Sequence, residues 1–409
     1  MKQLFTLFTV ILFATGMAFA QPDCTGGRYT TFDLFSSTDV TSGVTFGNNV
    51  ALTGSAVDLK MDVYEPAGDT DTDRPVVIVA FGGSFIGGDR SQVAFMCEIL
   101  AKMGYVAVAP DYRVGFFFPS QVTTTLAVLR GAHDVSACVR YLKKTAAEDG
   151  NPYGIDCERI IVGGISAGAI AAIHSAYFDK VAEIPSYMSA DTAGLGGVAG
   201  NSGTPNYSHD AIGVLSFSGA IGDTAWMEAG DAAIVSIHEE LDNVVPYYTQ
   251  EVSVSGFPTG LIASGSGDVH VRAANLGLNE ELLGYAGVSN HVGYLNNPID
   301  QNALDFMRDF LADLVCNSGS TNSCAQIPSG VADVERNSIN LFPNPTAEVL
   351  NFSAEEVATI EVLDAMGRVV LNGNANKGKN RLDVSELPTG SYTLRTVGKT
   401  IGTAHFIKE

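Results

Sequence analysis

Positive charge is scarce in this sequence of 409 residues. Lysine and arginine together number 23, against 45 aspartates and glutamates, so the formal net charge is −22. A surface of this sign repels phosphate backbones and anionic membranes, and it disfavours strongly anionic substrates. We therefore expect no nucleic acid among the partners of this protein.

Long apolar runs are missing after the first twenty residues. Residues 1–20 place Lys2 before an apolar stretch and end in Ala18-Phe19-Ala20, the A-x-A pattern of a cleavage site. We predict a signal peptide that is cleaved before Gln21. A membrane anchor is the alternative, but the run is shorter than the ~20 apolar residues that a span needs. The mature chain is expected to lack a membrane span and to be secreted or attached to the cell surface.

Cys-x-x-Cys pairs and histidine-rich clusters are also missing, so we expect no structural metal, and no cofactor is implied. The six cysteines are an even number in a chain predicted to be exported, which indicates disulfide bonds but allows fifteen pairings. Cys316 and Cys324 flank a short loop of Ser, Asn and Gly, and we expect this pair first. Alternatively, Cys97 and Cys138 are buried thiols.

The sequence contains an alternation of strand-like and helix-like segments. Continuous apolar runs predict buried strands at residues 75–81, 105–109, 160–162, 213–217 and 232–237. Helix-like segments cover residues 93–103, 123–147, 167–178 and 246–254. This order predicts an α/β domain with a mostly parallel sheet, helices on both faces, and ligands at the carboxyl ends of the strands. An alternating pattern at residues 57–63 predicts an edge strand.

The composition changes after residue 316. A stretch rich in Gly and Ser predicts a linker over residues 317–338. Short alternating strands then indicate a small β-sandwich over residues 339–409. We thus expect a signal peptide (1–20), an α/β catalytic domain (21–316), the linker and the sandwich. Within the α/β domain, residues 181–212 are expected to be a long loop that either caps a site or is a plain surface insertion.

Ser166 lies between a predicted strand and a predicted helix, in Gly164-Ile165-Ser166-Ala167-Gly168. Gly-x-Ser-x-Gly at such a junction is typical of a nucleophile elbow, where the turn leaves room only for small residues. The alternative is that the glycines merely pack a helix close to a strand. A serine nucleophile needs a base and an orienting carboxylate, and after an elbow these follow in the order Asp or Glu, then His.

Three histidines lie beyond the next suitable acid. His405 belongs to the predicted sandwich, and His270 lies in the first turns of a helix-like segment, which cannot easily reach a strand end. His291 lies in a loop after the strand-like residues 282–286, so we predict that His291 is the base.

The predicted acid follows the strand at residues 232–237. Asp242 is preferred over Glu239 and Glu240, because its short side chain lies just before a Val-Val-Pro turn and is the more rigid orienter. The alternative for this stretch is an acidic helix cap.

A glycine-rich turn after the first buried strand predicts the donors for an oxyanion. The backbone amides of Gly83, Ser84 and Ala167 are expected to form the hole. Three phenylalanines after another strand end, with Phe117 at their centre, are candidates to line a pocket for an apolar or aromatic acyl group; alternatively they are core residues.

The segments FGGSFIGGDR, APDYRVG, GISAGAI, HEELDNVVP and GVSNHVGY together resemble the α/β-hydrolase superfamily, in particular its secreted carboxylesterases of the feruloyl-esterase and hormone-sensitive-lipase-like groups. The resemblance spans about residues 50 to 315. It implies that Ser166 is the nucleophile, His291 the general base and then acid, and Asp242 the orienting acid. This chain has Phe81 and Ser84 where family members usually have His and a third glycine, which puts the oxyanion donors in question.

The tail contains LFPNPT, DAMGRVV, LPTGSY and a basic end, in this order. It resembles the C-terminal sorting domain of type IX secretion, which implies export through that machinery and removal of the tail. A carbohydrate-binding sandwich is the alternative.

The sequence therefore predicts a secreted serine esterase that hydrolyses carboxylic esters through an acyl-enzyme on Ser166. One alternative is a prolyl-oligopeptidase-like serine peptidase, weakened because a propeller-sized N-terminal segment is missing. Another is a non-catalytic surface binding or adhesion module. The ester itself stays open among feruloylated or acetylated polysaccharides, lipids, small esters and polyesters.

Overall fold

The computed structural model of the chain contains two compact units, Met1–Gln326 and Ile327–Glu409. The structure describes residues 22–115, 118–188, 195–254, 256–320, 324, 337–338, 341–354, 357–364, 368–397 and 402–409. The predicted signal peptide, the predicted pocket residue Phe117 and most of the predicted linker lie outside these residues.

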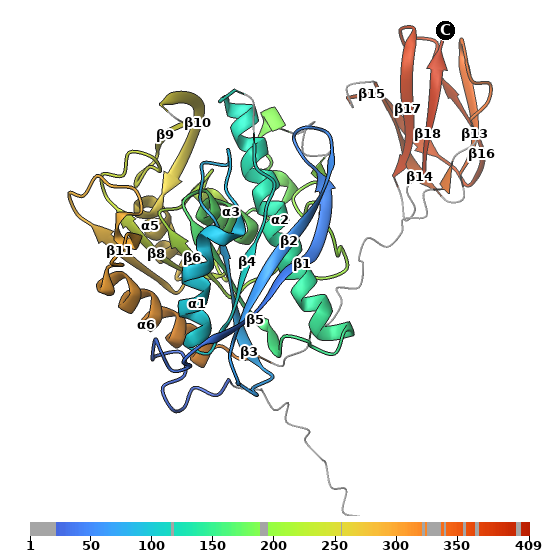
Figure 1. Cartoon of the computed structure of the whole chain (residues 1–409). Coiled ribbons are helices and arrows are strands. Elements are labelled where there is room, and N and C mark those ends of the chain that lie inside the picture. Colours follow the sequence, from blue (N-terminus) through green and yellow to red (C-terminus); the bar gives the residue numbers. More distant parts are fainter. Residues whose placement is uncertain are drawn as a thin grey trace, which may run out of the picture. The chain divides into compact units, whose positions relative to one another are not determined.

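The first unit is built around an eight-stranded, mostly parallel sheet with helices on both faces (Figure 1). In spatial order the strands are β1 (Thr38–Val50), β2 (Ala56–Pro66), β4 (Val106–Pro110), β3 (Arg74–Ala80), β5 (Ile155–Ile165), β6 (Gly213–Phe217), β8 (Ala233–Glu239) and β11 (Glu280–Tyr285). Among these strands only β2 runs antiparallel to its neighbours. The predicted α/β class is confirmed, and the carboxyl ends of β3, β5, β6, β8 and β11 meet at one edge of the sheet.

Residues 57–63 form a strand as predicted, but the prediction that it lies at the edge of the sheet is wrong. β2 does alternate between exposed and buried residues, but it is the second strand, because β1 pairs with it along its length. β1 is mostly polar and exposed, and it contains Gly43 and Gly47, so it lacks the apolar pattern by which a strand is found in a sequence. By contrast, every residue of β3 is buried, as its continuous apolar run predicts.

Five α-helices accompany the sheet in the described residues: α1 (Ala94–Lys102), α2 (Gln121–Glu148), α3 (Ala167–Tyr177), α5 (Ser266–Leu276) and α6 (Gln301–Asn317). Short 3-10 turns lie at η1 (Arg90–Val93), η2 (Val181–Glu183), η3 (Ser186–Met188), η4 (Thr224–Trp226) and η5 (Gly293–Leu295). None of the described helices combines the length and apolar character needed to cross a bilayer.

The helix predicted at residues 246–254 is wrong. Residues Gln250–Val254 form β9, which pairs in antiparallel fashion with β10 (Phe257–Gly265). β10 continues the pairing to β7 (Ala220–Ile221) and so makes a small second sheet. The reason is local: Val252 and Val254 alternate with polar residues, and Gly256 takes a positive φ of 80° in the turn, which favours a hairpin over a helix.

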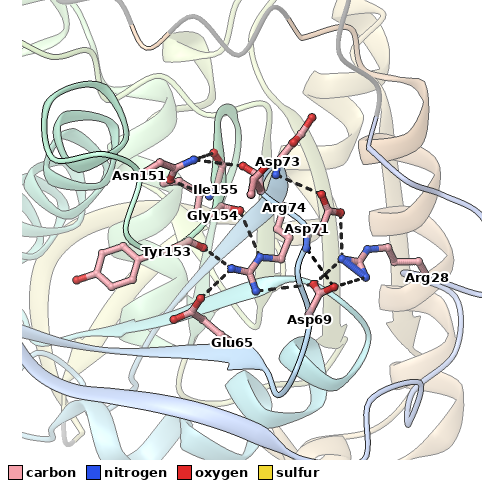
Figure 2. A network of polar contacts seen from close by, with 11 residues as sticks. Arg28, Glu65, Asp69, Asp71, Asp73, Arg74, Asn151, Tyr153, Gly154 and Ile155 are labelled. Atoms are coloured by element: carbon pink, nitrogen blue, oxygen red, sulfur yellow. Dashed lines mark hydrogen bonds and ion pairs between the residues drawn. The ribbon is translucent and has the colours of Figure 1, made fainter.

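Two arginines hold the amino-terminal edge of the sheet together (Figure 2). Arg74, the first residue of β3, donates to Glu65 at 2.8 Å and to the carbonyl oxygens of Tyr153 and Gly154 at 2.6 and 3.2 Å. Arg28 donates to Asp69 at 2.5 Å and to Asp71 at 3.0 Å. The network therefore ties the segment before β1 and the segment before β5 to the ends of β2 and β3.

Two disulfides close the same region, and the pair predicted first is wrong. Cys24 is bonded to Cys316, and Cys157 to Cys324, with Cα atoms 6.1 and 5.6 Å apart. Next to α6, the carbonyl of Ser318 accepts from Arg159 and the hydroxyl of Ser320 donates to Asp156. Both partners belong to β5, which also carries Cys157. Cys97 and Cys138 are buried free thiols, as the alternative reading of the sequence has it.

The second unit consists mostly of antiparallel strands around its own core. One sheet has the order β12 (Asn337–Ser338), β18 (Gly402–Lys408), β17 (Gly390–Val397), β14 (Ala358–Leu363) and β15 (Val369–Ala375), and β13 (Val349–Ala354) pairs with β16 (Gly378–Asp383). Among its described strands β12 pairs in parallel with β18. Phe352, Val362, Leu394 and Phe406 are among the residues buried between them.

Candidate active site

Ser166 lies at the tight turn between β5 and α3. It takes φ 55° and ψ −118°, a strained conformation for a residue with a side chain. A Cβ atom on Gly164 would lie 2.5 Å from the carbonyl carbon of Gly168, and one on Gly168 would lie 2.1 Å from the carbonyl oxygen of Ala80. Only glycine fits at both places, so the Gly-x-Ser-x-Gly spacing is what allows the turn to form.

A chain of hydrogen bonds joins Ser166, His291 and Asp242. Ser166 Oγ lies 2.8 Å from His291 Nε2, and His291 Nδ1 lies 2.6 Å from Asp242 Oδ2. The three residues come from the ends of β5, β8 and β11, which are brought together because parallel strands end at one edge of a sheet. Of the sequence candidates, His270 on α5 instead pairs with Glu280 at the start of β11, and Glu240 does not join this chain of contacts.

Asp242 is held as a carboxylate by donors on several sides. Its Oδ1 accepts from the amides of Val244 and Val245 at 2.8 and 3.1 Å, and His238 Nε2 lies 3.3 Å from Oδ2. Burial by itself raises the pKa of Asp242, but the hydrogen bonds from His238, His291 and the Val244 amide outweigh it and hold the pKa well below its usual value. The carboxylate thus stays ionised while it orients His291.

Glu239 holds the loop that carries His291. This buried carboxylate ends β8 and accepts from the amides of Val292 at 3.1 Å and Gly293 at 2.6 Å. Val292 has a φ of 49°, which is costly for a β-branched residue. The two hydrogen bonds therefore stabilise a strained turn directly after His291. Sequence reasoning weighed Glu239 only as a rival to Asp242 and did not foresee this contact, because it depends on how β8 and β11 lie beside each other.

The predicted oxyanion segment lies against the elbow. A Cβ atom on Gly82 would lie 3.4 Å from Ser166 Cβ, so the end of β3 touches the serine turn. Ser84 and Phe85 have positive φ values of 54° and 58°, and Ser84 lines the same cavity as Ser166 and Ala167. Gly83 does not line this cavity; its carbonyl accepts from the amide of Ile86 at 2.9 Å. Ala167 opens α3, where the first amides have no partner within the helix.

A cavity of about 670 Å³ opens beside Ser166. Its walls come from α2, α3, the β9–β10 hairpin and the turns η2 to η4. Residues 182–185 and Tyr187 belong to the loop whose role the sequence leaves open, and they line this cavity, which favours the capping role over a plain insertion. The neighbouring Phe118 is 82% exposed and is not a core residue. In the described part of the chain, no group of three His, Cys, Asp or Glu residues is arranged to hold a metal ion.

The strand order and the serine turn agree with what the family matches show: an esterase-like α/β-hydrolase with a secretion sorting tail. Residues 61–195 match the family model BD-FAE, a family of α/β-hydrolase esterases, and residues 340–408 match the model of the secretion system C-terminal sorting domain. The resemblances seen in the sequence are thereby confirmed for both parts of the chain. No curated protein is similar enough in sequence to count as a match.

Solved structures of one enzyme, Thermogutta terrifontis esterase 2, are similar to this chain. The form phosphorylated by paraoxon is 21% identical over 68% of this chain and 95% of its own, with a TM-score of 0.48. The propionate-bound form is 20% identical over 72% and 97%, also with a TM-score of 0.48. The apo form is 21% identical over 67% and 91%, with a TM-score of 0.45.

Proposed function

We propose that this protein is a secreted serine carboxylesterase that works through an acyl-enzyme on Ser166. The observation that carries the proposal is the continuous chain of hydrogen bonds from Ser166 through His291 to the ionised Asp242. A serine alcohol is a weak nucleophile, and a positioned imidazole with an orienting carboxylate is the arrangement that activates it.

Ser166 Oγ attacks the ester carbonyl carbon while its proton passes to His291 Nε2. The negative charge on the carbonyl oxygen is stabilised by backbone amides, for which Gly83, Ser84 and Ala167 are the predicted donors; Ser84 and Ala167 are favoured, since they line the cavity. The bond to the alcohol then breaks, and His291 returns the proton to the leaving oxygen. Water repeats the sequence on the acyl-enzyme and releases the acid.

The same geometry gives weaker support to the two alternative functions. A binding or adhesion module has no need of a strained serine within 2.8 Å of an imidazole that is itself paired with a buried carboxylate. A serine peptidase uses the same three groups, so only the substrate separates it from an esterase. We propose the ester because the match to BD-FAE is a match to esterases.

The protein is proposed to reach the cell exterior in two steps. Residues 340–408 form a type IX sorting domain, which indicates secretion or cell-surface attachment. A signal peptide over residues 1–20, cleaved near Ala20, supplies the first step across the inner membrane.

The test is hydrolysis of nitrophenyl acetate, nitrophenyl butyrate and methyl ferulate by the mature chain and by Ser166→Ala. The variant should lose roughly 10⁴-fold or more in kcat. Ser175→Ala is the matched control, because Ser175 is a buried serine of α3, the helix that follows Ser166, and its hydroxyl bonds Ser136 instead; it should keep activity. Comparison of an ester with the corresponding nitroanilide separates esterase from peptidase. Equal activity of Ser166→Ala and the wild type would refute the proposal.

A further inference from the structure

The cavity beside Ser166 is elongated along α3. Residues spaced four apart on this helix, namely Ile170, His174 and Phe178 after Ser166, all line it. Side chains at this spacing lie above one another on one helix face. At 1.5 Å per residue, the cavity wall runs ~18 Å from the serine to Phe178.

The long walls are largely apolar. α2 contributes Val128 and Leu129 beside the polar Gln121, Thr124 and Thr125, and the β9–β10 hairpin contributes Val252, Val254 and Leu261 beside Ser253. Ile170 and Val252 also pack against the small cluster of Ala220, Val245 and Ala263, which closes the wall from the side of β7. A chain that enters from Ser166 thus meets aliphatic side chains on all of these elements.

The far end of the cavity is aromatic. The indole of Trp226 stands edge-on to the rings of Phe178 and His174, with ring centres 5.1 and 5.6 Å away. His174 is committed to the fold, because Nδ1 lies 2.8 Å from the carbonyl of Ile170 and Nε2 accepts from the amide of Gly222 at 3.2 Å. Burial lowers the pKa of His174 to about 4, so this ring is uncharged at neutral pH.

Among the described residues that line the cavity, the charged ones all come from the segments next to Phe178 and Trp226, and we call them its rim. Lys180 pairs with Glu228 at 2.5 Å, and Asp223 and Glu183 also line this rim. Three carboxylates against one ammonium leave the rim negative. A ligand with an anionic end would therefore be disfavoured there.

The position of His291 shows which half of an ester the cavity takes. His291 is within the described residues but does not line the cavity, whereas Ser166, Ser84 and Ala167 do. The leaving alcohol must lie near His291 Nε2, which gives it a proton. The alcohol therefore lies outside the cavity, and the acyl group lies inside.

We infer that this cavity is an acyl-binding channel for an extended, uncharged aliphatic acyl group, and that Trp226 and Phe178 determine the chain length it accepts. With carbon–carbon bonds near 1.5 Å, a chain of about ten carbons spans roughly 12 Å, which matches the ~12 Å rise along α3 from Ser166 to His174, the ring against which Trp226 packs. The inference rests on the proposed esterase function and names its substrate class.

The kinetic test is a series of nitrophenyl esters from acetate to dodecanoate. We expect kcat/KM to rise ~100-fold from acetate to decanoate, because each buried methylene favours binding. Trp226→Ala should lower kcat/KM for decanoate at least tenfold and leave acetate within twofold; Trp226→Phe is the milder variant should the first fail to fold. Tyr248→Ala is the control, since Tyr248 is an exposed aromatic residue outside the cavity, and it should change neither ester.

The binding test uses the fact that Trp226 is the single tryptophan of the chain. In Ser166→Ala, methyl decanoate below its solubility limit should change the tryptophan fluorescence in a saturable way, and methyl acetate at the same concentration should not. If the wild type prefers acetate and the fluorescence does not change, the proposed acyl-binding channel is refuted, whereas the proposed esterase function is supported. A fluorescence change in a protein that cleaves no ester would keep the channel and refute the esterase.

Discussion

Carboxylates gather at both edges of the central sheet, but their partners differ. At the amino-terminal edge, Asp69 and Asp71 are paired with Arg28, and Glu65 with Arg74. At the carboxyl edge, Asp242 contacts imidazoles and backbone amides and Glu239 accepts from backbone amides, and among the described residues no arginine pairs with either. A guanidinium keeps its proton at any physiological pH, whereas an imidazole exchanges it. The same type of acid therefore holds the fold together at one edge and, in the proposed mechanism, is part of a proton path at the other.

The two edges also shift the pKa of their carboxyl groups in opposite directions. Hydrogen bonds hold the pKa of Asp242 below its usual value despite burial, while burial raises the pKa of Glu65 in spite of Arg74. Donors aimed at one carboxylate from several directions therefore overcome the effect of burial on its pKa, which a single partly exposed ion pair does not. This contrast leads to four predictions.

Asp242→Asn should cost about 10⁴-fold in kcat, because the amide no longer fixes the tautomer and orientation of His291. The matched change at the other edge, Asp69→Asn, should leave kcat per folded molecule within twofold and lower the Tm instead. Steady-state hydrolysis of one nitrophenyl ester by both variants measures the contrast. Equal losses of kcat in the two variants would contradict the prediction that only the carboxyl edge contributes to catalysis.

Arg74→Met should destabilise the fold by about 3–5 kcal/mol, because Glu65 and two buried carbonyl oxygens lose their donor together. Urea unfolding gives the free energy, and activity per folded molecule should stay unchanged. Lys144→Met is the control: Lys144 pairs with Glu148 and Asp149 at the surface, and its loss should leave the unfolding midpoint where it is. A selective loss of kcat in Arg74→Met would contradict a purely structural role.

Glu239→Gln should lower kcat by roughly tenfold with little change in KM, because Gln offers one carbonyl oxygen to two amides and the turn at Val292 loosens. Glu239 acts through the loop and is a positioning residue. The readout specific to that role is a fall in kcat while KM stays nearly unchanged. A rise in KM alone, or a fall in Tm without any loss of kcat, would argue against it.

Lowering the pH should change the free energy of unfolding of variants at the two edges in opposite directions relative to the wild type. The pKa of Asp242 is lower in the folded chain than the ~3.9 of an unfolded Asp, so its stabilising contribution is complete above about pH 5 and is lost as the pH falls through and below 4. Asp242→Asn should therefore lose less free energy of unfolding than the wild type between pH 7 and 3, by ~1 kcal/mol. Glu65, with a raised pKa, has the opposite sign, so Glu65→Gln should lose more than the wild type. Urea titrations at the two pH values test both signs, and parallel curves for the three proteins would refute them.

Much of the fold was predictable because buried parallel strands are apolar along their whole length. β3 and β6 are buried at every residue and were visible as continuous runs. β1 was not, because its long pairing with β2 leaves most of its polar side chains exposed. β9 was mistaken for a helix, since five residues with two valines carry too little periodicity to decide between the two forms.

The residues proposed to do the chemistry could be found in the sequence alone: small residues around Ser166, then an acid, then a histidine, each after a strand. Because the strand ends of a parallel sheet meet at one edge, the order of these motifs was enough to predict that Ser166, Asp242 and His291 lie together. Three features required the folded chain: which cysteines pair, the hold of Glu239 on the loop of His291, and the position of Trp226 in the cavity wall. These contacts join segments that no local pattern relates, because side-chain packing between distant elements sets them.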